Sequence, residues 1–162
     1  LDDLNSSKGY KQSVVKIALA RADGKPANPA TATVAVINFG KSARYNTRYQ
    51  YDANTNTYQR SIGGEASLDR EEGQIAPSVV VALTVQQTTV QEDGIRENII
   101  TTGQGKATIF QNGSVVEGIW RKADRTSPLE LLDANGKAIA LTRGQTWIAA
   151  VPGGTGSVSW QQ

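Results

Sequence analysis

Short segments rich in β-branched and aromatic residues recur along the chain, and turn-forming residues separate them. The segment Arg44–Tyr51 alternates with a period of two: its tyrosines and Thr47 fall on one face, and its arginines, Asn46 and Gln50 on the other. A period of two is that of a β-strand and does not fit a helix. Asn112-Gly113, between two β-rich segments, predicts a hairpin with a two-residue type I′ turn.

About ten such segments predict an all-β fold, either an antiparallel barrel or a sandwich of short strands joined by hairpin turns. The chain of 162 residues has room for one ordinary domain. We expect this domain at residues 31–152, after an N-terminal connecting segment (1–30) and before a flexible C-terminal tail (153–162). The expected strands are Thr31–Phe39, Arg44–Tyr51, Thr57–Ile62, Ser78–Val85, Glu97–Thr102, Lys106–Gln111, Val115–Val116, Leu129–Leu132, Ile139–Leu141 and Thr146–Val151.

Other stretches are less regular. Leu1–Leu4 is a candidate short helix stub, and residues 13–21 fit either a helix or an edge strand. Glu65–Gln74 is charged and predicts a loop, and Gln91–Gly94 predicts a turn. The chain begins with Leu1 and contains no Met, so we interpret it as a piece of a longer protein. Targeting signals missing from such a piece say nothing about its compartment.

Composition excludes much catalytic chemistry. The chain has no Cys and no His, which rules out disulfides, thiolate zinc sites, cysteine nucleophiles, the Ser-His-Asp arrangement and His-ligated metals. The net charge of +2 gives no strong attraction to nucleic acid or to an anionic membrane. We therefore expect no cofactor and no nucleic-acid partner.

Two motifs resemble ligand-binding loops and fail on inspection. Asp52-x-Asn54-x-Asn56 imitates the start of a calcium loop, but Thr57 and Gly63 occupy the sixth and twelfth positions, where Gly and Glu are needed. A hairpin turn is the better interpretation. Gly103-Gln-Gly105-Lys106 resembles a phosphate loop but lacks the first Gly and the Ser/Thr. These glycines instead predict a bend or bulge between strands.

Aromatic residues offer two further hypotheses. The Arg44–Tyr51 strip could stack bases, but its tyrosines and arginines fall on opposite faces, which favours a core face backed by a solvated basic face. Trp120 and Trp147 could line a groove for a sugar or peptide. Anchoring of the core, with each indole N–H bonded at the rim, is the favoured interpretation.

Several phrases of the sequence, taken in order, resemble the C-terminal domain of the YerB-like lipoproteins, a bacterial envelope family of unknown function. The phrases span roughly residues 30–151 and are Tyr49–Arg60, Gly63–Asp69, Pro77–Val81, Thr102–Gly105, Phe110–Gly113, Gly118–Lys122, Asp133–Gly136 and Leu141–Trp147. The resemblance implies a separate N-terminal domain behind a lipoprotein signal, and hence an extracytoplasmic protein anchored to the membrane. Where the family pattern runs Gly-x-Pro-His-x-Asp, this chain has Gly64-Glu-Ala-Ser-Leu-Asp69, so any role of that His is absent here.

These observations favour a non-catalytic envelope module that binds a protein partner, a cell-wall polymer or the N-terminal domain of its parent. The alternative is a carboxylate-dependent hydrolase of cell-wall glycans, with Asp69 and Glu71 or Glu92 as the acid and its partner. A carboxyl group with a raised pKa in a cleft would favour the hydrolase. The candidate binding surface comprises Arg44, Arg48, Gln50, Arg60, Asp69, Arg70, Glu71, Glu72 and Trp120, with Arg121 and Lys122 extending a basic patch.

Overall fold

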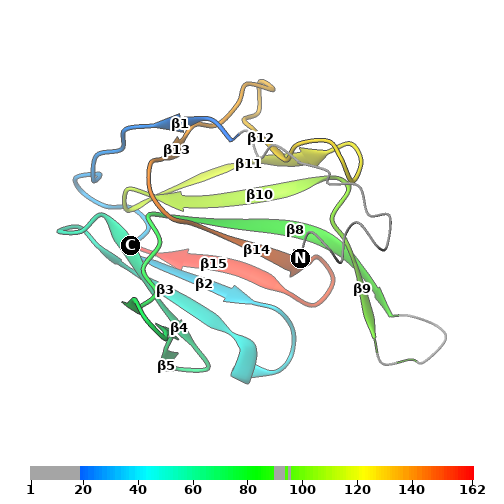
Figure 1. The fold of residues 1–162 in the computed structure, drawn as a ribbon, viewed down its shortest axis with the longest axis horizontal. Helices are drawn as coiled ribbons and strands as arrows, with labels where there is room; N and C mark the ends of the chain where they lie inside the picture. Colours follow the sequence, from blue (N-terminus) through cyan, green and yellow to red (C-terminus); the bar gives the residue numbers. More distant parts are fainter. Residues whose placement is uncertain (1–18, 90–93, 95) are drawn as a thin grey trace, which may run out of the picture.

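Two β-sheets that share a core dominate the computed structural model, which describes residues 19–89, 94 and 96–162 (Figure 1). The sheets form a sandwich-like arrangement, so the all-β prediction is confirmed and the barrel alternative is not. The predictions for residues 1–18 and for most of the turn Gln91–Gly94, Glu92 included, lie outside the described residues. In the described part of the chain, no helix is long and apolar enough to cross a membrane.

The larger sheet has the strand order β12-β11-β10-β8-β14, and β9 pairs with the far end of β8. Neighbours run antiparallel except β14 and β8, which are parallel. The strands are β8 (Val79–Thr89), β9 (Glu97–Ile100), β10 (Gly103–Gln111), β11 (Ser114–Lys122), β12 (Glu130–Leu132) and β14 (Thr146–Pro152).

The second sheet has the order β15-β2-β3-β4-β5 and is antiparallel throughout. Its strands are β2 (Val34–Asn38), β3 (Thr47–Asp52), β4 (Thr57–Ile62), β5 (Glu65–Ala66) and β15 (Ser157–Gln161). Two small pairs complete the fold: β1 (Arg21–Ala22) runs parallel to β13 (Leu141–Thr142), and β6 (Leu68–Asp69) pairs with β7 (Gly73–Gln74).

The continuous apolar run in β8 is buried on both faces, as predicted. Val80 and Ala82 belong to the core between the two sheets. Val79, Val81 and Leu83 belong to a second core cluster on the opposite face. The second cluster also contains Trp120, Leu131 and Leu141.

The alternation predicted for Arg44–Tyr51 is confirmed from Thr47 onward: Thr47, Tyr49 and Tyr51 are buried, and Arg48 and Gln50 are exposed. The start of the predicted strand was wrong. Residues 43–45 form the short 3-10 helix η1 (Ala43–Tyr45), and Tyr45 is 58% exposed. The polar–aromatic alternation of residues 44–46 is too short to distinguish a strand from a turn, so the sequence pattern did not locate the start of β3.

The predicted hairpin turns are present. Asn112 and Gly113 have φ of 57° and 71°, the left-handed conformation that a type I′ turn requires. Asn56, with φ of 54°, ends the turn between β3 and β4. Gly103, with φ of +101°, lies where the chain bends from β9 into β10, as its glycine predicted.

Two predictions of irregular structure need correction. Within the expected tail 153–162, residues Ser157–Gln161 form β15, which pairs with β2 along its whole length. The expected loop Glu65–Gln74 contains the short strands β5, β6 and β7. Within the expected connecting segment, residues 20–22 are tied to the domain: Arg21 and Ala22 form β1, and the Leu141 N–H donates to the Ala20 carbonyl oxygen over 2.8 Å.

Candidate functional site

A depression of about 370 Å³ lies where β14 begins, next to the short β6–β7 hairpin. Its walls combine an aromatic ring, two amides and two carboxylates with a short apolar stretch. The lining residues are Asp69, Glu72, Gln74, Ile75, Ala76, Gln145 and Trp147. Three of the segments that carry the family resemblance, Tyr49–Arg60, Gly63–Asp69 and Leu141–Trp147, meet at or beside it.

Backbone hydrogen bonds hold these separate segments together. The Arg60 N–H donates to the Ile75 carbonyl oxygen over 2.9 Å, and the Ile75 N–H donates to the Ser67 carbonyl oxygen over 2.9 Å. The Gln145 carbonyl oxygen accepts from the N–H groups of Ser78 and Val79. The segment leading into β8 therefore links β4, the β6–β7 hairpin and the start of β14.

Arg60 and Trp147 form a cation–π pair beside the depression. The guanidinium carbon of Arg60 lies 4.5 Å from the centre of the Trp147 ring, and its Nη1 donates to the Ser67 Oγ over 2.6 Å. No described carboxylate pairs with Arg60. The ring and the hydroxyl stabilise a half-buried cation and fix its orientation.

Arg60 points toward the core, unlike Arg48, its basic neighbour on β3. It lies directly opposite Tyr49, which is completely buried. Burial raises the pKa of Tyr49, while Arg60 and Thr47 lower it in part. The Tyr49 hydroxyl and the Arg60 Nε are both buried without a hydrogen-bond partner of good geometry. This corner of the core therefore contains polar atoms that could still form hydrogen bonds.

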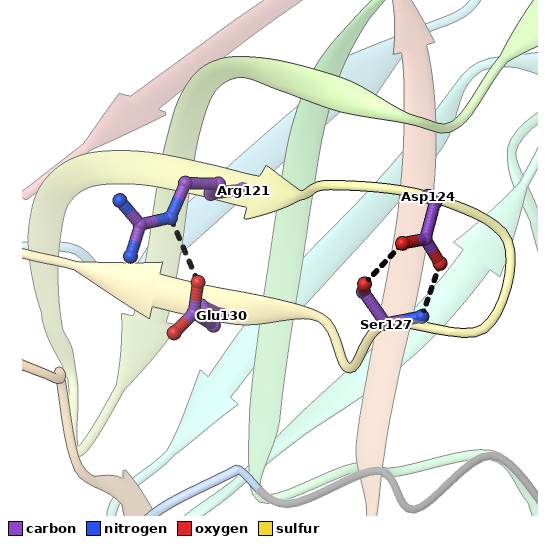
Figure 2. A network of polar contacts seen from close by, with 4 residues as sticks. All are labelled: Arg121, Asp124, Ser127 and Glu130. Atoms are coloured by element: carbon purple, nitrogen blue, oxygen red, sulfur yellow. Dashed lines mark hydrogen bonds and ion pairs between the residues drawn. The ribbon is translucent and has the colours of Figure 1, made fainter.

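The carboxylate of Asp69 is held in its ionised form. Its Oδ1 accepts from the Glu71 N–H over 2.9 Å and from the Glu72 N–H over 3.0 Å, and these bonds lower its pKa. Hydrogen bonds from Thr126 and Ser127 lower the pKa of Asp124, and the bond from Arg121 lowers that of Glu130. Figure 2 shows the Ser127 and Arg121 contacts. A general acid for glycoside cleavage needs a raised pKa, which none of these three carboxyl groups has.

The structure brings only some of the predicted surface residues together. Arg60, Asp69 and Glu72 are at the depression, and Arg70 and Glu71 are in the adjoining turn. Arg48 and Gln50 lie on the exposed face of β3, where Arg48 Nη2 donates to Gln50 Oε1 over 2.7 Å, and Arg44 lies in η1.

The structure does not bring Arg121 and Lys122 to the depression: both are on β11, in the other sheet from Arg60, and neither lines it. Trp120 is 2% exposed: it anchors the core, as favoured from the sequence, and does not lie on the exposed surface where it was also placed as a binding residue. Arg121 pairs with Glu130 at 2.8 Å (Figure 2). Lys122 donates to the carbonyl oxygens of Arg125 and Ser127. Both cations are therefore engaged within the β11–β12 hairpin.

Sequence reasoning missed Gln74, Ile75, Ala76 and Gln145 as lining residues. The Gln74 Nε2 donates to three carbonyl oxygens, those of Arg60, Ser67 and Ile75, and so braces the wall. No local pattern marks such a residue. Among the described residues, no cluster of three or more Asp and Glu side chains could hold a metal ion.

Comparisons with known proteins agree with the fold. Residues 35–148 match the family described as "Protein of unknown function (DUF3048) C-terminal domain". The chain is 31% identical over 150 residues to "Putative lipoprotein YerB" of Bacillus subtilis (strain 168), a match that covers 90% of this chain and 43% of that protein. The crystal structure of YerB from Bacillus subtilis matches with a TM-score of 0.73 at 25% identity, over 98% of this chain and 52% of that one. The chain thus spans about half the length of these relatives.

Proposed function

Since the chain belongs to the DUF3048 C-terminal domain family, we propose that it is a non-catalytic binding module of an extracytoplasmic lipoprotein. The name of the Bacillus subtilis relative supports the lipoprotein part of this proposal. The Trp147 depression, defined by the seven lining residues given above, is the proposed binding site. Its volume falls within the range of about 300–1,000 Å³ that is typical of ligand sites.

The Arg60–Trp147 pair is the observation that carries the proposal. A half-buried cation stacked on an indole, with spare polar atoms behind it, is an oriented recognition group. Arg and Trp are also the residues most enriched at the energetic centres of protein interfaces. The carboxylate of Asp69, with its lowered pKa, is suited to binding rather than to proton donation.

A protein partner fits this site better than a stacked sugar ring. One side of the Trp147 ring holds the Arg60 guanidinium, and the indole also packs against the core between the sheets. Little of the ring face is then left for a sugar, whereas its edge and the surrounding amides suit a polypeptide. We favour the N-terminal domain of the parent protein as the partner, ahead of another envelope protein or a cell-wall polymer.

Thermal melting of the isolated chain tests the proposal, with the parent's N-terminal domain and purified peptidoglycan fragments as separate additions. A ligand that binds only the folded state raises the melting temperature. At a concentration of 100 times Kd it adds about 2.7 kcal/mol to the free energy of unfolding. Glu72→Arg reverses a charge inside the depression, and Glu65→Arg makes the same change on β5 outside it. We expect only Glu72→Arg to abolish the shift.

Equal shifts in the two variants would place binding elsewhere. No shift with either addition would reject the module for these partners. Release of new reducing ends from the glycan would contradict the non-catalytic proposal and return attention to the carboxylates.

A further inference from the structure

A large bulge interrupts the six-stranded sheet between β9 and β10. Both strands pair with the same edge of β8: Ile100 pairs with Gln86, and Ala107 pairs with Leu83. Six residues, 101–106, therefore lie opposite only two residues of β8, Thr84 and Val85. Large bulges of this kind re-aim side chains and are common beside binding sites.

The bulge borders a depression of about 410 Å³. The depression is separate from the Trp147 depression and shares no residue with it. Gly103 leaves open space where a Cβ would be, and at Gly105 the Trp120 indole lies close against the backbone. Gly103 therefore leaves room for a ligand to approach the backbone closely, whereas the space at Gly105 is filled by the indole.

The polar side chains around this depression are mostly hydroxyls and amides, and Val85, Ile100 and Trp120 add apolar surface. Thr84 and Gln86 come from β8, and Thr102 and Gln104 from the bulge. Hydroxyl and amide groups both donate and accept hydrogen bonds. Lys106 is the single charged residue among the described residues of the lining, and it pairs with Glu117 at 2.5 Å. The depression therefore presents mixed hydrogen-bonding groups and a balanced charge.

We propose that the depression at the 101–106 bulge binds a neutral sugar. A neutral polyol is the ligand class that needs donors and acceptors together and carries no charge to neutralise. A cationic ligand would find no carboxylate among the lining residues that the structure describes, and an anionic ligand would have to compete with Glu117 for Lys106. The proposal goes beyond the binding module proposed above and does not depend on the Trp147 depression.

Ligand-observed NMR with the complete chain tests this proposal, using cellobiose and chitobiose as neutral probes and glucuronic acid and glucosamine as charged ones. We expect saturation transfer from the protein to a neutral disaccharide that levels off as the sugar concentration rises. Both charged sugars should bind about tenfold more weakly. Gln104→Leu removes one amide from the depression and should weaken binding of the neutral sugar by about tenfold. Gln59→Leu, on the exposed face of β4, is the matched control and should leave binding unchanged.

Each other outcome overturns the proposal. Binding of glucuronic acid or glucosamine as tightly as the neutral sugars would reject the neutral class. Equal loss in Gln104→Leu and Gln59→Leu, or no loss in either, would place the sugar elsewhere. If no probe received saturation transfer from the protein, the site would be rejected. Equal melting temperatures of the variants would show that they are folded. None of these results bears on the binding module proposed above, which is tested separately by the melting-temperature shift with the N-terminal domain.

Discussion

The Trp120 indole N–H donates to the Thr84 carbonyl oxygen over 2.8 Å, across an intervening strand. Trp120 is on β11 and Thr84 is on β8, with β10 between them. The indole crosses β10 at Gly105, its direct partner in the ladder. A Cβ on Gly105 would lie 2.5 Å from that carbonyl oxygen and 2.7 Å from the indole nitrogen. This bond therefore requires glycine at position 105.

Gly105→Ala should destabilise the protein by about 1–3 kcal/mol, because the added methyl group must displace either the backbone of β8 or the buried indole. Gly154→Ala is the matched control, since a Cβ there meets no atom within 4 Å. Urea unfolding of both variants measures the difference. A Gly105→Ala protein as stable as Gly154→Ala would show that the sheet relaxes around the methyl group at little cost.

Asn112 joins three parts of the fold and also holds a left-handed turn. Its Oδ1 accepts from Asn56 Nδ2 over 3.0 Å and from Thr142 Oγ1 over 3.1 Å. Asn112→Gly keeps the turn geometry and loses these bonds, so we expect a loss of about 1–2 kcal/mol. Asn112→Ala adds the cost of a left-handed alanine, about 1 kcal/mol more. Chemical denaturation separates the two terms, and equal stability of both variants would mean that the turn bears no strain.

Local patterns were sufficient for much of the fold. The period of two in Thr47–Tyr51, the apolar run in β8 and the Asn112-Gly113 turn each carry their structural cause within a few residues. β15 was missed for the opposite reason. It contains only two apolar residues, and its strand character comes from pairing with β2, which lies more than a hundred residues earlier. Strands of two residues, such as β6, are too short for any period to appear.

The candidate site depends almost entirely on such distant contacts. Whether Arg60 faces solvent or the core is decided by its register opposite Tyr49, and its ring partner Trp147 is on another sheet. Sequence analysis could select Arg60 and Asp69 as polar candidates but had no means of pairing Arg60 with Trp147. It likewise grouped Arg121 with Arg60, although β4 and β11 lie in different sheets.

The Asp124 carboxylate closes the β11–β12 hairpin (Figure 2). It accepts from the hydroxyl and N–H of Thr126 and from those of Ser127, and these bonds hold its pKa well below the usual range. A lowered folded-state pKa gives stability that is present above the ordinary value, about 3.9, and is lost as pH falls below it. Asp124→Asn should therefore destabilise the protein at pH 7 and much less at pH 2. Urea unfolding at both pH values checks this, with Glu65→Gln as the control. A deficit that does not change with pH would exclude the carboxylate charge as its source.

Tyr58 should control stability at the opposite end of the pH range. It is completely buried, and its hydroxyl accepts from the Gly113 N–H over 3.0 Å. Burial raises its pKa well above the ordinary value of about 10. Tyr58→Phe leaves the buried Gly113 N–H without an acceptor, so we expect a loss of about 1–3 kcal/mol at pH 7.

That deficit should shrink as the pH rises above about 10. There Tyr58 ionises in the unfolded chain but not in the folded one, which destabilises the wild type and has no counterpart in the Phe variant. Tyr49 and Tyr51, whose pKa values are also raised, are present in both proteins, so their contributions cancel in the comparison. Guanidinium unfolding of both proteins at pH 7 and pH 11 measures the change. If the deficit were the same at both values, the Tyr58 hydroxyl would have to ionise equally readily in the two states, which contradicts its burial beneath the Asn112-Gly113 turn.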